Sequence, residues 1–209
     1  MNVKNIGIVA LIGGGLAFIL SNFIPNLKKY QSETKPTRYA VAVMAPNDNG
    51  VTGVVHFEDT GKGVLIKYNI RGLADGEHGF HIHEYGDLTD GCQSACAHFN
   101  PFGTTHGGLD SEERHEGDLG NITSKAGTAQ GSLQASTLSL DPQSITFIVG
   151  RMIIVHKDRD DLGLGGLNPA GEVVDEKVHA ESLKTGNAGK RMACGVIGCL
   201  LYTSPSPRD

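Results

Sequence analysis

Several histidines of this chain stand at spacings that could hold metal ions. His81 and His83 are separated by a single residue in the strand-like run GFHIHEY. Because alternate residues of a strand point to the same face, the two imidazoles would project together, as the ligands of one ion must. An HxH pair alone is weak evidence, since most such pairs are ordinary surface or core residues.

A stronger signal follows in a glycine-rich stretch, which contains His98, His106, His115 and Asp118. Three imidazole nitrogens and one carboxylate oxygen are a typical closed zinc set. The glycines between these residues would let the loop fold back so that the four side chains converge. The alternative is a polar loop with scattered, solvated histidines.

A further histidine, His156, ends the apolar run RMIIVH. A histidine at the end of a strand usually has no special role. Together with His81, His83 and His98, however, it would complete an all-imidazole set, which suits copper. The residues alone therefore indicate two groups of metal ligands that have His98 in common.

The rest of the chain predicts the scaffold for these ligands. Its 209 residues suit one domain plus extra segments. Short β-branched runs from residue 39 onward, separated by turn residues, predict about eight strands of an antiparallel sandwich or Greek-key barrel. Two strand-poor stretches, roughly 86–119 and 157–190, are expected to be functional loops. A net charge of -5 and the lack of a basic stripe argue against nucleic acid as a partner.

The N-terminal part differs in composition from the rest. Residues 1–25 contain Lys4 and an apolar run, 6–24, which is just long enough to span a bilayer. They predict a signal peptide or a signal anchor, cleaved or uncleaved, with a buried core helix as the alternative. Residues 26–38 read as a polar linker. We therefore expect the secretory pathway, an extracellular or membrane-anchored product, and membrane contact only through residues 6–24.

The last residues, 199–209 (CLLYTSPSPRD), do not continue the strand pattern. They match the translation of a transposase sequencing adapter, codon for codon. We therefore interpret 199–209 as an assembly artefact and leave this segment out of the fold prediction. Resequencing the gene through its stop codon tests this hypothesis.

Several runs over residues 39–198 resemble the copper–zinc superoxide dismutase family, in the family's order and spacing: GFHIHEYGD, HFNPFGTTHGG, RHEGDLGNI, GRMIIVH, DDLGLGG and TGNAGKRMACGVIG. The resemblance implies an all-β fold, an eight-stranded Greek-key barrel or sandwich with two long functional loops. It also implies an enzyme that converts superoxide to dioxygen and hydrogen peroxide with a redox-cycling copper and a structural zinc. A homodimer and delivery of copper by a chaperone are further implied.

The resemblance also assigns roles to single residues. It implies the copper ligands His81, His83, His98 and His156, and the zinc ligands His98, His106, His115 and Asp118. His98 would bridge the two metals, and Asp160 would orient one histidine of each set. Arg191 would position the superoxide anion. Lys184 and Thr185 would form the rim of the substrate channel.

The same resemblance implies a disulfide between Cys92 and Cys194, which would close a loop of about 100 residues, worth ~4.7 kcal/mol in the chain-entropy model. Such a bond persists in an oxidising compartment. Cys96 departs from the family pattern, in which a small residue is typical. Cys92 and Cys96 could be half of a metal site, but no second thiolate pair is near, and we expect Cys96 to be a free, buried thiol.

Other departures concern histidines and one loop. We interpret His78 as a structural residue, and we expect His56 and His179 to be solvated. Residues 167–183 include about a dozen residues more than the family pattern and are rich in acids. They could alter access to copper, but a harmless solvated insertion is the interpretation that we favour.

Three other functions compete with the enzyme. A non-catalytic relative, such as the dismutase-like domain of a copper chaperone, would lack copper ligands or the arginine, and this chain retains them. A copper-only dismutase would lack the zinc set, which is present. A structural β-sandwich with an incidental histidine cluster would bind no metal, so metal content separates it from the enzyme.

Overall fold

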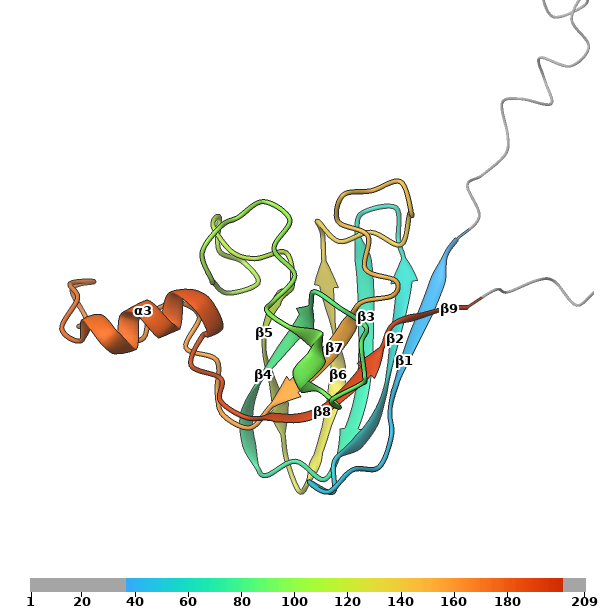
Figure 1. The fold of residues 1–209 in the computed structure, drawn as a ribbon, viewed down its shortest axis with the longest axis horizontal. Helices are drawn as coiled ribbons and strands as arrows, with labels where there is room; N and C mark the ends of the chain where they lie inside the picture. The colour runs from blue at the N-terminus through green and yellow to red at the C-terminus, as the bar shows by residue number, and fades with distance from the viewer. Residues whose placement is uncertain (1–36, 201–209) are drawn as a thin grey trace, which may run out of the picture. The chain divides into compact units, whose positions relative to one another are not determined.

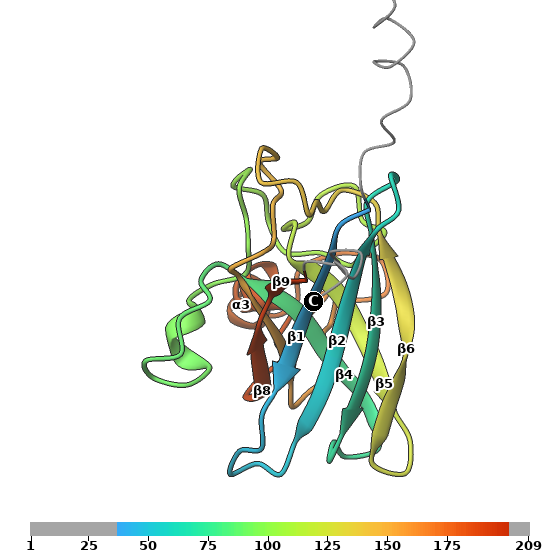
Figure 2. The same ribbon diagram turned by 90° about the vertical axis from the view of Figure 1, so that its right-hand side faces the viewer.

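The structure is a computed structural model that describes residues 37–200. These residues form a sandwich of two sheets in which all paired strands are antiparallel (Figures 1 and 2). One sheet has the strand order β6-β3-β2-β1-β9, and the other has the order β5-β4-β7-β8. The connections β3–β4, β5–β6, β6–β7 and β8–β9 therefore cross from one sheet to the other. The predicted all-β sandwich is confirmed.

The strands of the five-stranded sheet are β1 (Tyr39–Met44), β2 (Thr52–Asp59), β3 (Val64–Arg71), β6 (Thr128–Ala135) and β9 (Gly198–Leu200). The strands of the four-stranded sheet are β4 (Gly76–His83), β5 (Asp118–Ser124), β7 (Met152–His156) and β8 (Arg191–Val196). The long connections contain a short 3-10 helix, η2 (Gln93–Ala95), and one α-helix, α3 (Glu176–Thr185).

The strand count differs from the prediction at the end of the described chain. β9 pairs with β1 through Tyr39↔Leu200, Ala40↔Cys199 and Val41↔Gly198, so Cys199 and Leu200 belong to a ninth strand. Backbone hydrogen bonds at a sheet edge need no particular side-chain pattern, which is why the sequence did not show this strand. The interpretation of 199–209 as an adapter translation stays a prediction.

The predictions for residues 1–36 and 201–209 lie outside the described residues. These are the signal or anchor segment, most of the linker and most of the proposed adapter tail. Within residues 37–200, no helix combines the length and the apolar composition needed to cross a membrane.

The alternation of buried side chains explains how β4 carries both core and site residues. Phe80 and Ile82 belong to the main hydrophobic core, whereas His81 and His83 point to the opposite face of the strand. All four side chains are almost fully buried, because loops cover that second face. The prediction that His81 and His83 share one face is confirmed, with ring centroids 6.4 Å apart.

The neighbouring strand β7 is buried on both faces, with Ile153 and Val155 in the main core. Met152 and Ile154 form a second small core with Ala95 of η2, and the disulfide cysteines pack against it. The 86–119 loop therefore covers the outer face of β7. The predicted disulfide between Cys92 and Cys194 is confirmed, and it bonds this loop to β8.

One residue of the 86–119 loop has an unfavourable backbone conformation. Cys96 ends η2 with φ 63° and ψ -144°, a region in which glycine is strongly favoured. Its thiol is free and exposed, so the expectation of a buried Cys96 is wrong. A side chain at this turn points outward, while its backbone carbonyl is directed toward the protein, as the contacts of the site show.

We predict that Cys96→Gly stabilises the protein by roughly 1 kcal/mol, because relief of strain worth ~1–3 kcal/mol outweighs the added entropy of the unfolded chain. The midpoint of thermal unfolding should rise by about 2–4 °C. Cys96→Ala is the matched control, since it removes the thiol and keeps the Cβ atom. Equal midpoints for the Gly and Ala variants would contradict the role of backbone strain.

Candidate metal centre

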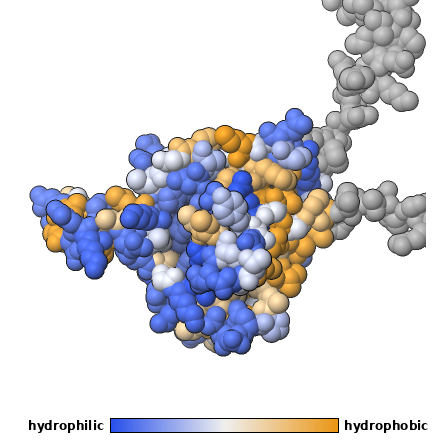
Figure 3. Space-filling view, in the orientation of Figure 1, coloured by the Kyte–Doolittle hydropathy of each residue, from blue (hydrophilic) through white to orange (hydrophobic). Residues whose placement is uncertain are grey.

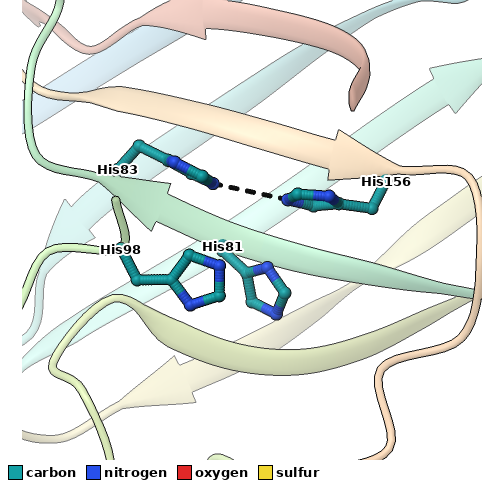
Figure 4. A group of neighbouring side chains, drawn as sticks. All are labelled: His81, His83, His98 and His156. Carbon is teal, nitrogen blue, oxygen red and sulfur yellow. Dashed lines mark hydrogen bonds between the residues drawn. The ribbon is translucent and has the colours of Figure 1, made fainter. Parts of the chain in front are cut away.

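Four imidazoles meet on the outer face of the four-stranded sheet (Figure 4). His81 and His83 come from β4, His156 ends β7, and His98 reaches them from the 86–119 loop, where it forms an isolated bridge with His83. Their potential ligand atoms all lie within 4.8 Å of one another. The structure thus brings together the whole set that the sequence predicted for copper.

Each of these imidazoles has one nitrogen held by a protein oxygen. The pairs are His81 Nε2 with Asp160 Oδ2 at 2.8 Å, His83 Nδ1 with the Cys96 carbonyl at 2.9 Å, His98 Nδ1 with Asp118 Oδ1 at 2.7 Å, and His156 Nδ1 with the Gly189 carbonyl at 3.1 Å. The second nitrogen of each ring is the atom that could bind a shared ion, and two of these atoms, His83 Nε2 and His156 Nε2, form a hydrogen bond with each other. In Figure 4 the Nε2 atoms of His83 and His156 face each other, 3.3 Å apart.

The second predicted set converges on one carboxylate oxygen. Asp118 Oδ1 lies 2.7 Å from His98 Nδ1, 3.0 Å from His106 Nδ1 and 3.2 Å from His115 Nδ1. The other oxygen, Oδ2, accepts the backbone N–H groups of Gly107 (3.1 Å) and His115 (2.9 Å). These two bonds fix the carboxylate so that Oδ1 faces the three imidazoles.

Two buried nitrogen atoms test whether metal ions fit here. Within the described residues, His81 Nδ1 and His106 Nδ1 are buried without a hydrogen-bond partner. His106 Nδ1 is close to Asp118 Oδ1, but the contact lacks the alignment of a hydrogen bond. An unpaired buried polar atom is costly, and a cation bound at each position would satisfy it. One orphan belongs to each set, so the donors fit two neighbouring metal ions.

Asp160 connects the two sets. It is fully buried, and its Oδ2 contacts His81 Nε2 while its Oδ1 contacts His106 Nε2, both at 2.8 Å. Its Oδ1 also accepts the backbone N–H of Leu162 at 2.7 Å. One carboxylate thereby fixes the ring orientation of one histidine in each set, as such outer partners of metal ligands do.

Burial keeps the copper-type imidazoles neutral. It lowers the pKa of His81, His83 and His98, and the neighbouring histidines lower the pKa values of His81 and His83 further. Burial also lowers the pKa of His156 to about 4. A neutral imidazole is the form that binds a metal.

His106 behaves differently because it lies between two carboxylates. Burial alone would lower its pKa, but the hydrogen bond with Asp160 and the negative charges of Asp118 and Asp160 outweigh burial and raise this pKa to about 9. Burial would likewise raise the pKa of Asp118, yet its close contacts with the rings of His106, His115 and His98 hold that pKa well below its usual range. The two carboxylates thus favour a positive charge at this position.

Arg191, the first residue of β8, lies beside the copper-type set. Its guanidinium donates to the carbonyls of Cys92, Gln93 and Cys96 in the 86–119 loop. The Cys96 carbonyl oxygen therefore accepts hydrogen bonds from both the Arg191 guanidinium and His83 Nδ1. This contact could not be predicted from the sequence, since any residue type offers the same backbone oxygen.

A pocket of about 960 Å³ opens over this cluster. Its walls include His83, His98, His156, Arg191, Lys184 and Thr185. The residues predicted for the copper set, the arginine and the channel rim therefore share one cavity. Glu181 and Asn187 also line it, although the sequence did not single them out.

Among the remaining histidines, two have the environment that the sequence predicted and one does not. His78 is structural, as expected: its ring nitrogens contact the His156 carbonyl at 3.0 Å and the Ala74 carbonyl at 2.9 Å. His56 is exposed on β2. His179 is not simply solvated, because it is half-buried and its Nδ1 contacts the Gly165 carbonyl at 2.9 Å.

The lengthened segment 167–183 is also not a fully solvated loop. Its second half belongs to α3, in which Ser182 is completely buried. Residues 169–178, which include Val173, Val174 and the start of α3, are exposed. The part of α3 from Ala180 to Thr185 reaches the pocket.

The fold and the two linked donor sets define a β-sandwich metalloprotein with adjoining copper-type and zinc-type sites. The family model described as copper/zinc superoxide dismutase matches residues 51–197. The chain belongs to this family.

Similar proteins agree with this membership. A copper–zinc superoxide dismutase of Paramecium bursaria Chlorella virus 1 is 53% identical over 167 residues, which cover 79% of this chain and 80% of the relative. The copper–zinc enzyme of Yarrowia lipolytica is 50% identical, over 76% of this chain and 96% of its own. An extracellular copper–zinc superoxide dismutase of Brugia pahangi is 46% identical, over 77% and 76%. The crystal structure of the clock protein EA4 superposes with a TM-score of 0.67 at 38% identity, covering 78% of this chain and 94% of that one.

Proposed function

We propose that this protein dismutates superoxide to dioxygen and hydrogen peroxide at the pocket beside Arg191. Copper and zinc are its cofactors, as for the family. We assign copper to His81, His83, His98 and His156, and zinc to His98, His106, His115 and Asp118. The observation that carries this assignment is the pair of orphaned buried nitrogens, His81 Nδ1 and His106 Nδ1, one in each donor set.

Bound copper supplies one-electron exchange with superoxide, whereas zinc, which has no redox couple in proteins, contributes charge and structure. The protein supplies four held imidazoles of which one, His98, serves both sets. His98 Nδ1 is engaged at Asp118. Its Nε2 is then the atom that can hold a proton for the peroxide product.

Arg191 supplies the anion site. A guanidinium has five N–H groups, and its bonds to the Cys92, Gln93 and Cys96 carbonyls use three of them. Two remain for a small anion in the pocket. Because the loop carbonyls fix the guanidinium, the donors are in place before superoxide arrives, and little ordering cost is left.

The overall charge of -5 does not prevent an anionic substrate from approaching. Charges farther away than ~8 Å are largely screened at physiological ionic strength. Two basic residues, Lys184 and Arg191, and one acidic residue, Glu181, line the pocket, so its charged side chains favour an anion. Enzymes of this class are known for such electrostatic steering.

The setting of the enzyme is also part of the proposal. A relative named as extracellular and the Cys92–Cys194 disulfide support a secreted protein, since disulfides persist in oxidising compartments. We further propose a homodimer that receives copper from a chaperone, as the family resemblance implies. Membrane anchoring through residues 6–24 stays a prediction.

Purified protein loaded with both metals should contain one copper and one zinc per chain, because the two donor sets are complete. Elemental analysis with a superoxide assay checks this. A protein that folds but retains neither metal would refute the assignment and would favour a structural β-sandwich.

We predict that His83→Ala abolishes superoxide turnover while most zinc stays bound, because His83 belongs to the copper set alone. His56→Ala, on the exposed face of β2, is the control and should behave as the parent. Metal content and turnover are measured on both variants. Parent-like turnover of the His83 variant would remove His83 from the copper site.

Arg191→Glu should slow turnover strongly and reverse the salt dependence of the rate, because it replaces an attractive charge in the pocket with a repulsive one. Lys62→Glu makes the same charge change on an exposed hairpin away from the pocket. We expect that control to keep the rate and its salt dependence. The second-order rate constant over a range of ionic strength is the measurement, and an unchanged rate in the Arg191 variant would exclude Arg191 from anion binding.

A further inference from the structure

Helix α3 carries part of the pocket rim, yet little of the helix is packed against the sandwich. It begins after the N-cap residue Asp175 and ends at Gly186, which has the left-handed conformation of a C-cap. Figure 1 shows α3 projecting away from the two sheets, and Figure 3 shows a mainly hydrophilic surface on this projection. Ser182 is its one buried residue. A helix of ten residues is marginal on its own in water, so contacts elsewhere must hold it.

The carboxylate of Asp161 provides such contacts at the pocket end of the helix. Its Oδ1 accepts the Ser182 hydroxyl at 2.5 Å, and its Oδ2 accepts the Asn187 amide at 2.6 Å. Ser182 lies in the last turns of α3, and Asn187 follows the C-cap. The Ser182 hydroxyl oxygen in turn accepts the backbone N–H of Gly165 at 3.0 Å. Hydrogen bonds to an ionised group are stronger than those between neutral groups.

Backbone bonds keep the same end of the helix next to the zinc-type set. The His106 N–H donates to the Leu183 carbonyl, and the Asp161 N–H donates to the Gly186 carbonyl, both at 2.8 Å. Gly186 is so close that a Cβ atom there would lie 2.0 Å from Asp160 Oδ1 and 2.4 Å from His106 Nε2. The end of α3 is therefore seated directly against the group that orients both metal sets.

We propose that Asp161 is a positioning residue for superoxide dismutation. It binds the pocket end of α3 through Ser182 and Asn187, and thereby keeps Lys184 and Thr185 at the rim where the anion enters. The proposal rests on the proposed function of the same pocket. His179 adds one ring contact, to the Gly165 carbonyl, whereas Asp161 bonds both Ser182 within the helix and Asn187 beyond it.

Asp161→Asn tests this role, because an amide has a single acceptor oxygen and would turn its NH2 group toward either Ser182 or Asn187. Asp175→Asn is the matched control. It removes the same charge from the same loop, while asparagine can still accept the Val178 N–H and cap the helix.

In Asp161→Asn, hydrogen exchange of the amides in residues 182–187 should be about tenfold faster, while exchange in β7 stays unchanged. The second-order rate constant per bound copper should fall several-fold at low ionic strength, with a weaker salt dependence. Asp175→Asn should match the parent in both measurements. Parent-like exchange in residues 182–187 would overturn the proposal, and so would a parent-like rate and salt dependence.

A double-mutant cycle with Lys184→Ala separates positioning from general stability. If Asp161 acts through Lys184, then Asp161→Asn changes the salt dependence of the rate constant when Lys184 is present but not in the Lys184→Ala background. An equal change in both backgrounds would contradict the proposed route. Ser182→Ala removes one of the same bonds and replaces Asp161→Asn if that variant does not fold or bind metal.

The outcomes also separate the two proposals. A parent protein that binds both metals but does not consume superoxide would refute the proposed function, and the exchange measurement would still test the contact between Asp161 and α3. A parent that turns over superoxide, with no effect of Asp161→Asn on exchange or salt dependence, would refute the positioning role alone.

Discussion

The site depends on a cluster of buried imidazoles organised by two carboxylates, Asp118 and Asp160. Removing a carboxylate from water is costly unless it is paired and hydrogen-bonded, and here each buried oxygen has close partners. Asp118 Oδ2 is held by two backbone N–H groups and Oδ1 faces three rings. Asp160 contacts one ring of each donor set. Loop segments that are far apart in the chain are therefore fixed around one cluster.

The 86–119 loop shows how these contacts act together with covalent bonding. His98, His106 and His115 attach one part of it to Asp118, and the Cys92–Cys194 disulfide bonds another part to β8. Arg191, also in β8, donates to the carbonyls around η2. The loop that carries zinc-type ligands thus also positions the arginine of the copper-side pocket, and disturbance of one side should be felt at the other.

Sequence patterns with a fixed period correctly predicted the strands and the faces to which their side chains point. Alternation in β4 placed His81 and His83 on one face, and the sandwich followed from short runs separated by turns. Contacts made by the backbone were not predictable in this way. The Cys96 carbonyl binds His83 and Arg191 whatever its side chain is, and β9 needs only free backbone groups at the edge of β1. The burial of Ser182 and the contact of His179 depend on how an irregular loop returns to the sandwich. A local sequence pattern does not predict the path of such a loop.

The lengthened 167–183 segment illustrates how a loop can grow without rebuilding the site. Its pocket end is fixed by polar contacts at Ser182 and Leu183, and at Gly186 just beyond it, while residues 169–178 are exposed. Added length at the far end of α3 therefore extends into solvent and changes few contacts near the metals. The last turn still brings opposite charges to the rim, Lys184 and Glu181, and Glu181 accepts the Thr185 hydroxyl at 3.1 Å. Because screening shortens the reach of the other acidic groups, the placement of this last turn has more influence on the potential at the pocket than the composition of the exposed segment.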